Sequence, residues 1–114
     1  MKATLYGIKN CDTMKKARAW LDAHEVAYDF HDYKVSGITR ELLGKWAETV
    51  GWEVLLNRAG TTFRKLPDAA RANLTERKAI DLMLEQPSMI KRPVFSRGRT
   101  LLVGFSEERY SAIR

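Results

Sequence analysis

Strand and helix patterns alternate in the first third of the chain, and this alternation limits the folds open to it. Residues 3–6 form a short apolar run typical of a β-strand, and residues 27–31 form a second, aromatic-rich one. Between them, residues 14–24 place apolar side chains on one helical face and charged side chains on the other. This order predicts a right-handed βαβ unit with parallel strands.

The middle of the chain is expected to be mainly helical. Thr39 begins one helix pattern, and a second runs from Thr75 to Pro87, with each threonine placed as an N-cap. Residues 52–56 are expected to extend briefly, and residues 57–62 to form a loop rich in hydrogen-bond donors. No repeat or linker separates this region from the rest, so we expect one domain over residues 1–114.

The last part of the chain predicts a β-hairpin and a short helix. Residues 94–96 and 100–103 are strand patterns joined by a glycine-containing turn, and Ser106 is placed to cap a final helix. The order of elements matches an α/β, thioredoxin-like fold with a mixed sheet, a C-terminal hairpin and a helical insertion over roughly residues 37–90. Such a sheet places ligands at the carboxyl edge of its first strand.

Composition narrows the classes of function. A single cysteine among 114 residues excludes a disulfide within the chain. The net charge of +6 is scattered without a basic block, so we expect no nucleic-acid partner. Neither a signal peptide nor a membrane-length apolar run is evident, which predicts a cytoplasmic protein without a membrane partner.

Cys11 lies where the first strand pattern ends and the first helix pattern begins. Unpaired N–H groups and the positive end of the helix dipole favour a thiolate there, and the thiolate is the nucleophile. A lone cysteine is also often a small, buried, inert residue. The position alone leaves both interpretations open.

Arg92 and Pro93 precede the hairpin and form the second candidate feature. Proline restricts the residue before it to an extended backbone, which fixes the direction of the Arg92 side chain. A fixed guanidinium binds a carboxylate or another oxyanion through two hydrogen bonds. The alternative is an edge-strand proline beside a solvated arginine.

Several segments together resemble the ArsC family over essentially the whole chain. They are Tyr6 to Cys11, Leu55 to Arg58, Phe63 to Leu66, Ile80 to Pro87, Ile90 to Pro93, and Val103 to Phe105. The family includes glutaredoxin-linked arsenate reductases and Spx-type regulators of RNA polymerase. The segments around Asn57 and Val103 are most similar to its YffB-like branch, for which glutathione-dependent thiol chemistry is suspected.

The resemblance implies a thioredoxin-like fold with a helical insertion and assigns roles to three residues. Cys11 would be the nucleophile, Pro93 the cis-proline that faces it, and Arg92 the arginine that binds an anion. A cis X-Pro bond is uncommon, so its presence would indicate a constrained site.

The sequence also departs from two branches of that family. Arsenate reductases of this type have a histidine where this chain has Gly7, and two further arginines where it has Asn57, beside Arg58, and Gly104. Spx-type regulators sense oxidation through a Cys-x-x-Cys pair, whose second position here is Met14. These departures weaken arsenate reduction and redox sensing as functions of this chain.

The resulting prediction is a glutathione-dependent thiol reductase with one catalytic cysteine, Cys11. Because the chain has no second cysteine, an external thiol must release the adduct formed on Cys11. Substrate-binding residues are predicted to be Lys9, Asn10, Thr13, Asn57, Arg58, Arg92 and Pro93. We expect a monomer with no metal and no tightly bound cofactor, with glutathione as co-substrate and glutaredoxin as a candidate partner. Arsenate reduction and an Spx-like, non-enzymatic role at RNA polymerase are the alternatives.

Overall fold

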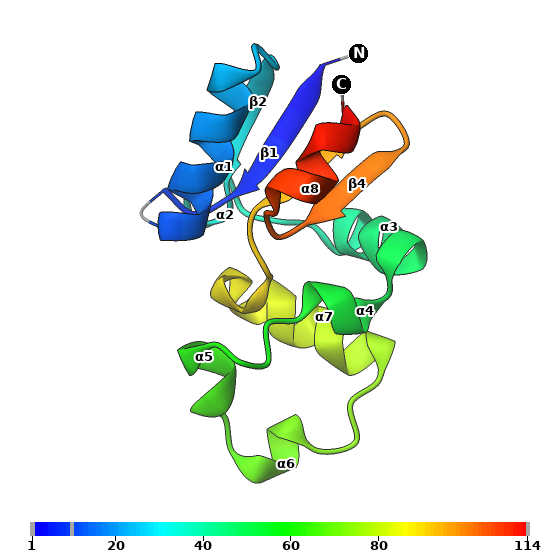
Figure 1. Ribbon diagram of the computed structural model, residues 1–114. Coiled ribbons are helices and arrows are strands. Elements are labelled where there is room, and N and C mark those ends of the chain that lie inside the picture. Colours follow the sequence, from blue (N-terminus) through cyan, green and yellow to red (C-terminus); the bar gives the residue numbers. More distant parts are fainter. Residues whose placement is uncertain (1, 10, 114) are drawn as a thin grey trace. The chain divides into compact units, whose positions relative to one another are not determined.

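The computed structural model describes residues 2–9 and 11–113, which form two compact units (Figure 1). The first unit runs up to Ser36 and resumes at Arg92. The second comprises Gly37–Lys91, the segment expected to be a helical insertion. That the whole chain acts as one domain stays a prediction.

The first unit is built on a four-stranded mixed sheet in the described residues, with strand order β2-β1-β3-β4. β1 pairs with β2 in parallel and with β3 antiparallel, and β3 pairs antiparallel with β4. This arrangement confirms the predicted thioredoxin-like fold with its C-terminal hairpin. The elements of this unit are β1 (Ala3–Gly7), α1 (Asp12–Ala23), β2 (Tyr28–Asp32), α2 (Tyr33–Ser36), β3 (Val94–Arg97), β4 (Thr100–Val103), α8 (Glu107–Tyr110) and the 3-10 helix η2 (Ser111–Ile113).

The core of this unit lies between α1, the sheet and the C-terminal helices. Alternate residues of β1 are buried, which is the period expected for a strand with one covered face. On α1, the buried side chains recur at helical spacing, and Trp20 meets the Tyr110 ring edge-on, 5.7 Å between centroids. Phe95 of β3 lies under the same ring, so α1 and α8 cover one face of the sheet.

The second unit is helical. Thr39 and Thr75 accept hydrogen bonds from the backbone N–H groups of Leu42 and Lys78, as the cap pattern predicted. Its elements are α3 (Arg40–Val50), α4 (Trp52–Leu55), α5 (Thr61–Arg64), α6 (Asp68–Arg71), α7 (Glu76–Glu85) and the 3-10 helix η1 (Pro87–Met89).

Two segments of the second unit differ from the sequence prediction. Residues 52–55 form a helical turn instead of extending, because Gly51 with φ +90° ends α3 and lets the chain restart as a helix. Only Leu56 is extended, and it forms an isolated antiparallel bridge to Ile90. The predicted loop over 57–62 already begins α5 at Thr61.

Candidate active site

Four segments of the first unit end or begin at the same edge of its sheet. The pairs Gly7 with Asp32, Tyr6 with Val94, and Val94 with Val103 place the ends of β1, β2 and β4 beside the start of β3. The turn that holds Cys11, the start of α2, the Arg92–Pro93 pair and the turn after β4 therefore gather at this edge. It is the carboxyl edge of β1 predicted from the sequence.

Cys11 is the N-cap residue of α1. Its extended backbone (φ −146°, ψ 130°) lets its carbonyl accept the first helical hydrogen bond, from the Lys15 N–H at 3.0 Å. The thiol is half-buried. The sulfur is thus presented at the helix N-terminus and is not enclosed in the core.

The surroundings of Cys11 lower the pKa of its thiol below the ordinary value. Partial burial is the largest single influence and acts to raise the pKa. It is outweighed by the Met14 N–H, the Arg92 side chain and the Thr13 N–H, which hydrogen-bond the sulfur, together with the positive charge of Arg92. Helix geometry and one arginine therefore favour the thiolate.

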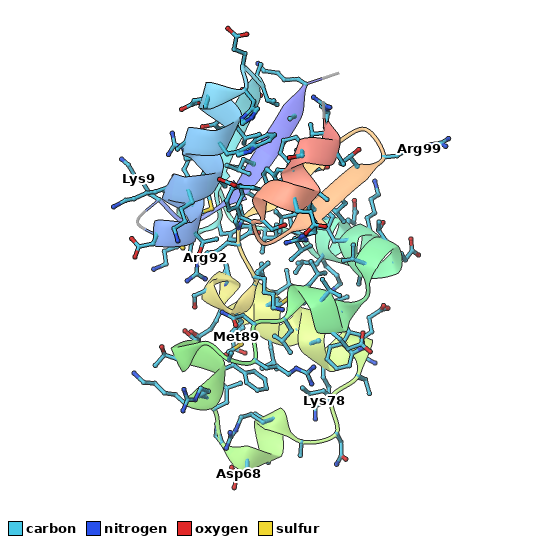
Figure 2. All side chains as sticks on the ribbon, viewed as in Figure 1. Lys9, Asp68, Lys78, Met89, Arg92 and Arg99 are labelled. Atoms are coloured by element: carbon cyan, nitrogen blue, oxygen red, sulfur yellow. The ribbon has the colours of Figure 1, made fainter. Side chains whose placement is uncertain are left out.

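The Arg92–Pro93 peptide bond is cis, as the resemblance implied. Pro93 is buried, and its carbonyl oxygen accepts a hydrogen bond from the Gly104 N–H at 2.8 Å. Arg92 is half-buried and extends from this edge (Figure 2). A thiolate beside a guanidinium is an arrangement suited to nucleophilic attack on an electrophile that carries or develops negative charge.

Tyr33 is a member of this cluster that sequence reasoning missed. Its side chain is 1% exposed, and burial raises the pKa of its phenol far above the usual value, although Arg92 acts in the opposite direction. Its ring stacks on Tyr6 at 6.5 Å between centroids. The sequence position of Tyr33 could have revealed it. Tyr33 directly follows β2, which is parallel to β1, so it lies at the same edge of the sheet as Cys11.

Met14 occupies the space beside Gly7. A Cβ at position 7 would lie 2.3 Å from the Met14 sulfur and 2.7 Å from its methyl carbon. Met14 is itself 1% exposed, so its side chain fills this space from inside the core. The Met14 thioether therefore fits in this position only because Gly7 has no side chain.

Arg109 is a second residue at this edge that sequence reasoning missed. Its guanidinium donates to the Val103 carbonyl at 2.8 Å and to the Ser106 hydroxyl at 3.2 Å. Its remaining terminal nitrogen is 3.4 Å from where a Gly104 Cβ would stand. Gly104, directly after β4, has no side chain of its own. The guanidinium of Arg109, which belongs to α8, lies over it instead.

The other predicted site residues are less closely tied to Cys11. Lys9 is exposed and extends outward from the turn before α1 (Figure 2), and Asn10 lies outside the described residues. Asn57 and Arg58 belong to the second unit, where the Asn57 N–H donates to Met89 and Arg58 lies 5.9 Å from the Trp52 ring centre. Their substrate-binding roles stay predictions.

Two other kinds of feature are absent from the described residues. Within 2–9 and 11–113, no three His, Cys, Asp or Glu side chains are grouped closely enough to hold a metal ion. In the same part of the chain, no helix has the length and apolar character needed to cross a membrane.

Comparisons with known proteins agree with this geometry. A solved YffB protein structure is 64% identical and covers 97% of both chains with a TM-score of 0.95. An arsenate reductase (ArsC) related protein from Brucella melitensis is 58% identical, with a TM-score of 0.80, covering 98% of this chain and 93% of its own. The global transcriptional regulator Spx of Streptococcus mutans is 30% identical over 112 residues, covering 96% of this chain and 80% of its own. Because residues 6–113 match the family model described as ArsC family, the chain belongs to the ArsC family.

Proposed function

We propose that this protein is a glutathione-dependent thiol reductase in which Cys11 is the nucleophile. The observation that carries the proposal is the lowered pKa of the Cys11 thiol at the N-terminus of α1, with the Arg92 side chain beside it. Family membership and the arsenate reductase related relative support a thiol-dependent reductase in general terms. Glutathione as the co-substrate is our more specific step.

The first chemical step is attack by the Cys11 thiolate on one sulfur of a disulfide. The disulfide bond of the substrate breaks, one half leaves as a thiolate, and the other half becomes bonded to Cys11 as a mixed disulfide. Arg92 favours this step because it stabilises the attacking thiolate and lies near the negative charge that develops.

The second step needs a thiol from outside the chain, since Cys11 is its only cysteine. A glutathione thiolate attacks the mixed disulfide, a new disulfide that contains glutathione forms, and Cys11 leaves as the thiolate. No electrons are left on or taken from the protein over the cycle. Glutathione carries two carboxylates and one ammonium, and Arg92 is suited to one carboxylate.

The test is mass spectrometry of the protein mixed with glutathione disulfide. The expected result is one glutathione bound through a disulfide to Cys11, and its loss when reduced glutathione is added. Cys11→Ser is the control and should remain unmodified. A wild-type protein that stays unmodified after prolonged incubation would contradict the proposal.

Arsenate reduction is a second candidate, and the arsenate reductase related protein at 58% identity favours it. The guanidinium of Arg109 over Gly104 adds a fixed positive group near Pro93 that the sequence comparison did not suggest. Steady-state turnover of arsenate with glutathione and glutaredoxin decides this candidate. Absence of turnover, in a preparation that does form the glutathione adduct, removes it.

A regulatory role at RNA polymerase is a third candidate, supported by the similarity to Spx. Complementation of a deletion strain by the Cys11→Ser variant distinguishes it from both enzymes. A fully complementing variant would favour a binding role in which Cys11 is incidental.

A further inference from the structure

Tyr33 is the first residue of α2, and its hydroxyl group is buried without a hydrogen-bond partner among the described residues. The side chain is 1% exposed, so the hydroxyl is shielded from water as well. Buried polar groups in native proteins are almost always hydrogen-bonded, because an unpaired one loses its bonds to water and gains none in return. The Tyr33 hydroxyl is therefore suited to form a hydrogen bond in another state of the site.

Strand register places the Tyr33 ring over the end of β1. Tyr33 directly follows β2, whose last residue pairs with Gly7. On the other side of β1, Tyr6 pairs with the first residue of β3, two positions after Arg92. The Tyr33 ring stacks on the Tyr6 ring, with 6.5 Å between the centroids. Tyr33 and Arg92 therefore approach the same end of β1 from its two sides.

Arg92 acts on both Tyr33 and Cys11. Burial raises the pKa of the Tyr33 phenol, and the positive charge of Arg92 opposes that rise. Among the described residues, Tyr6 is the other titratable group that acts on this phenol. The Arg92 side chain also hydrogen-bonds the Cys11 sulfur. Because a guanidinium has five N–H donors on a flexible stem, a small rearrangement of Arg92 can transfer a hydrogen bond between the sulfur and the phenol oxygen.

The charge on the Cys11 sulfur changes during the proposed reaction. The thiolate attacks glutathione disulfide, the disulfide bond breaks, a glutathione thiolate leaves, and a neutral mixed disulfide remains on Cys11. Arg92 keeps its positive charge but no longer has an anionic sulfur to bind. Protonation of the thiolate has the same consequence. In both neutral states, the Tyr33 oxygen is a buried acceptor close to the Arg92 charge.

We propose that Tyr33 is a positioning residue whose hydroxyl oxygen accepts a hydrogen bond from Arg92 whenever the Cys11 sulfur is uncharged. This bond holds the guanidinium at the sheet edge until the external thiol releases Cys11 as a thiolate again. It stabilises the thiol and the mixed disulfide relative to the thiolate. The inference rests on the proposed function for the mixed disulfide, whereas its effect on the thiol requires only the charge of Cys11.

The first test measures the pKa of the Cys11 thiol in Tyr33→Phe from the pH dependence of alkylation by iodoacetamide. Loss of the hydroxyl removes a bond that favours the neutral thiol, so the pKa should fall below the wild-type value. Tyr28→Phe is the matched control and should leave this pKa unchanged, because the Tyr28 hydroxyl accepts instead from Arg18 at 3.2 Å. In an Arg92→Met background, Tyr33→Phe should no longer change the pKa, since the donor is absent.

The second test measures the equilibrium constant for adduct formation between Cys11 and glutathione disulfide. Mass spectrometry at fixed ratios of reduced to oxidised glutathione provides this constant. Above the Cys11 pKa, Tyr33→Phe should lower it by about two- to tenfold, the range of one hydrogen bond. Well below that pKa the thiol and the adduct are both neutral, so the constants of the variant and the wild type should agree. A purely structural effect of the hydroxyl would not depend on pH in this way.

A spectroscopic measurement on proteins that keep Tyr33 tests the inference if Tyr33→Phe does not fold. Alkylation of Cys11 by iodoacetamide leaves the sulfur neutral. In the carbon NMR spectrum of tyrosine-labelled protein, the ring carbon that bears the Tyr33 hydroxyl should then shift, while the corresponding carbon of Tyr28 should not. The Tyr33 shift should be absent in Arg92→Met. A Tyr33 signal that alkylation leaves unchanged would overturn the inference.

The inference and the proposed function fail separately. If the wild type forms the glutathione adduct and Tyr33→Phe leaves the Cys11 pKa unchanged, the inference is wrong and the proposed function stands. A fall in pKa that persists in the Arg92→Met background also overturns the inference. If no adduct forms but Tyr33→Phe lowers the pKa only when Arg92 is present, the proposed function is overturned and the role of Tyr33 stands.

Discussion

Replacement of Gly7 by alanine is expected to destabilise the protein, because Met14 occupies the space that the new methyl group needs. The added carbon would lie 2.3 Å from the Met14 sulfur, about 1.1 Å inside the 3.4 Å at which ordinary contact begins. Met14 is 1% exposed, so its thioether must be displaced within a packed core. Overpacking of this kind costs about 1–3 kcal/mol.

A smaller effect of the substitution acts in the opposite direction. Alanine restricts the unfolded chain more than glycine does, which raises the free energy of unfolding by about 0.4–1 kcal/mol. The net loss expected for Gly7→Ala is therefore about 0–2.6 kcal/mol in the free energy of unfolding, with a central value of about 1.3 kcal/mol. The assay is urea denaturation followed by circular dichroism.

The matched control is Gly44→Ala. Gly44 lies within α3, and a Cβ there has no neighbour within 4 Å. The same substitution should stabilise the protein by about 0.5–1 kcal/mol, since glycine is unfavourable inside a helix. Opposite signs at the two positions would isolate the effect of Met14.

A double-mutant cycle makes the reasoning refutable. Met14→Ala alone should cost about 2–5 kcal/mol, as for other large-to-small changes in a core. In the double variant the alanine methyl at position 7 enters the space that Met14 vacates. The double variant should therefore lose less stability than the sum of the two single-variant losses, by about 0.5–3 kcal/mol. Additive losses, or a stabilising Gly7→Ala, would refute the packing argument.

Three further predictions concern the site and the caps. Arg92→Met should raise the pKa of the Cys11 thiol, because the hydrogen bond and the positive charge of Arg92 are lost, and Arg92→Lys should raise this pKa less. The pH dependence of Cys11 alkylation measures both shifts. An unchanged pKa would show that Arg92 does not act on the sulfur. Because the folded-state pKa of Cys11 is lower than the unfolded one, the wild type should gain stability over Cys11→Ser as pH rises toward the unfolded-state pKa of about 8.5, and a pH-independent difference in urea titrations would contradict the lowered pKa. Thr75→Ala removes the acceptor of the 3.2 Å bond from the Lys78 N–H and should cost about 1 kcal/mol in thermal unfolding, whereas an unchanged melting temperature would mean that the cap contributes nothing.

Most of the first unit could be predicted because its local patterns agree with one another. The strand period around Leu5, the apolar face of α1 and the glycine turn at Gly98 each have a single good structural solution. The short helices of the second unit could not be found in this way. Segments such as Asp68–Arg71 are single turns with no buried side chain, too short to show helical periodicity.

The candidate site was predictable in its parts but not in its contacts. The sequence pointed to Cys11 through the strand-to-helix junction and to Arg92 through the following proline. It did not reveal Tyr33 or Arg109, because their proximity to this edge depends on strand register and on a side chain that folds back over Gly104. Thr13 was predicted as a substrate-binding residue, whereas the structure places its backbone N–H on the Cys11 sulfur.

The most direct test of the central claim is the rate of alkylation of Cys11 by iodoacetamide as a function of pH. An activated nucleophile predicts a midpoint below about 8.5, the usual value for a free cysteine, and a shift of that midpoint toward the usual value in Arg92→Met. A wild-type midpoint at or above about 8.5 would contradict the account, because Cys11 would then be an ordinary thiol at a helix end.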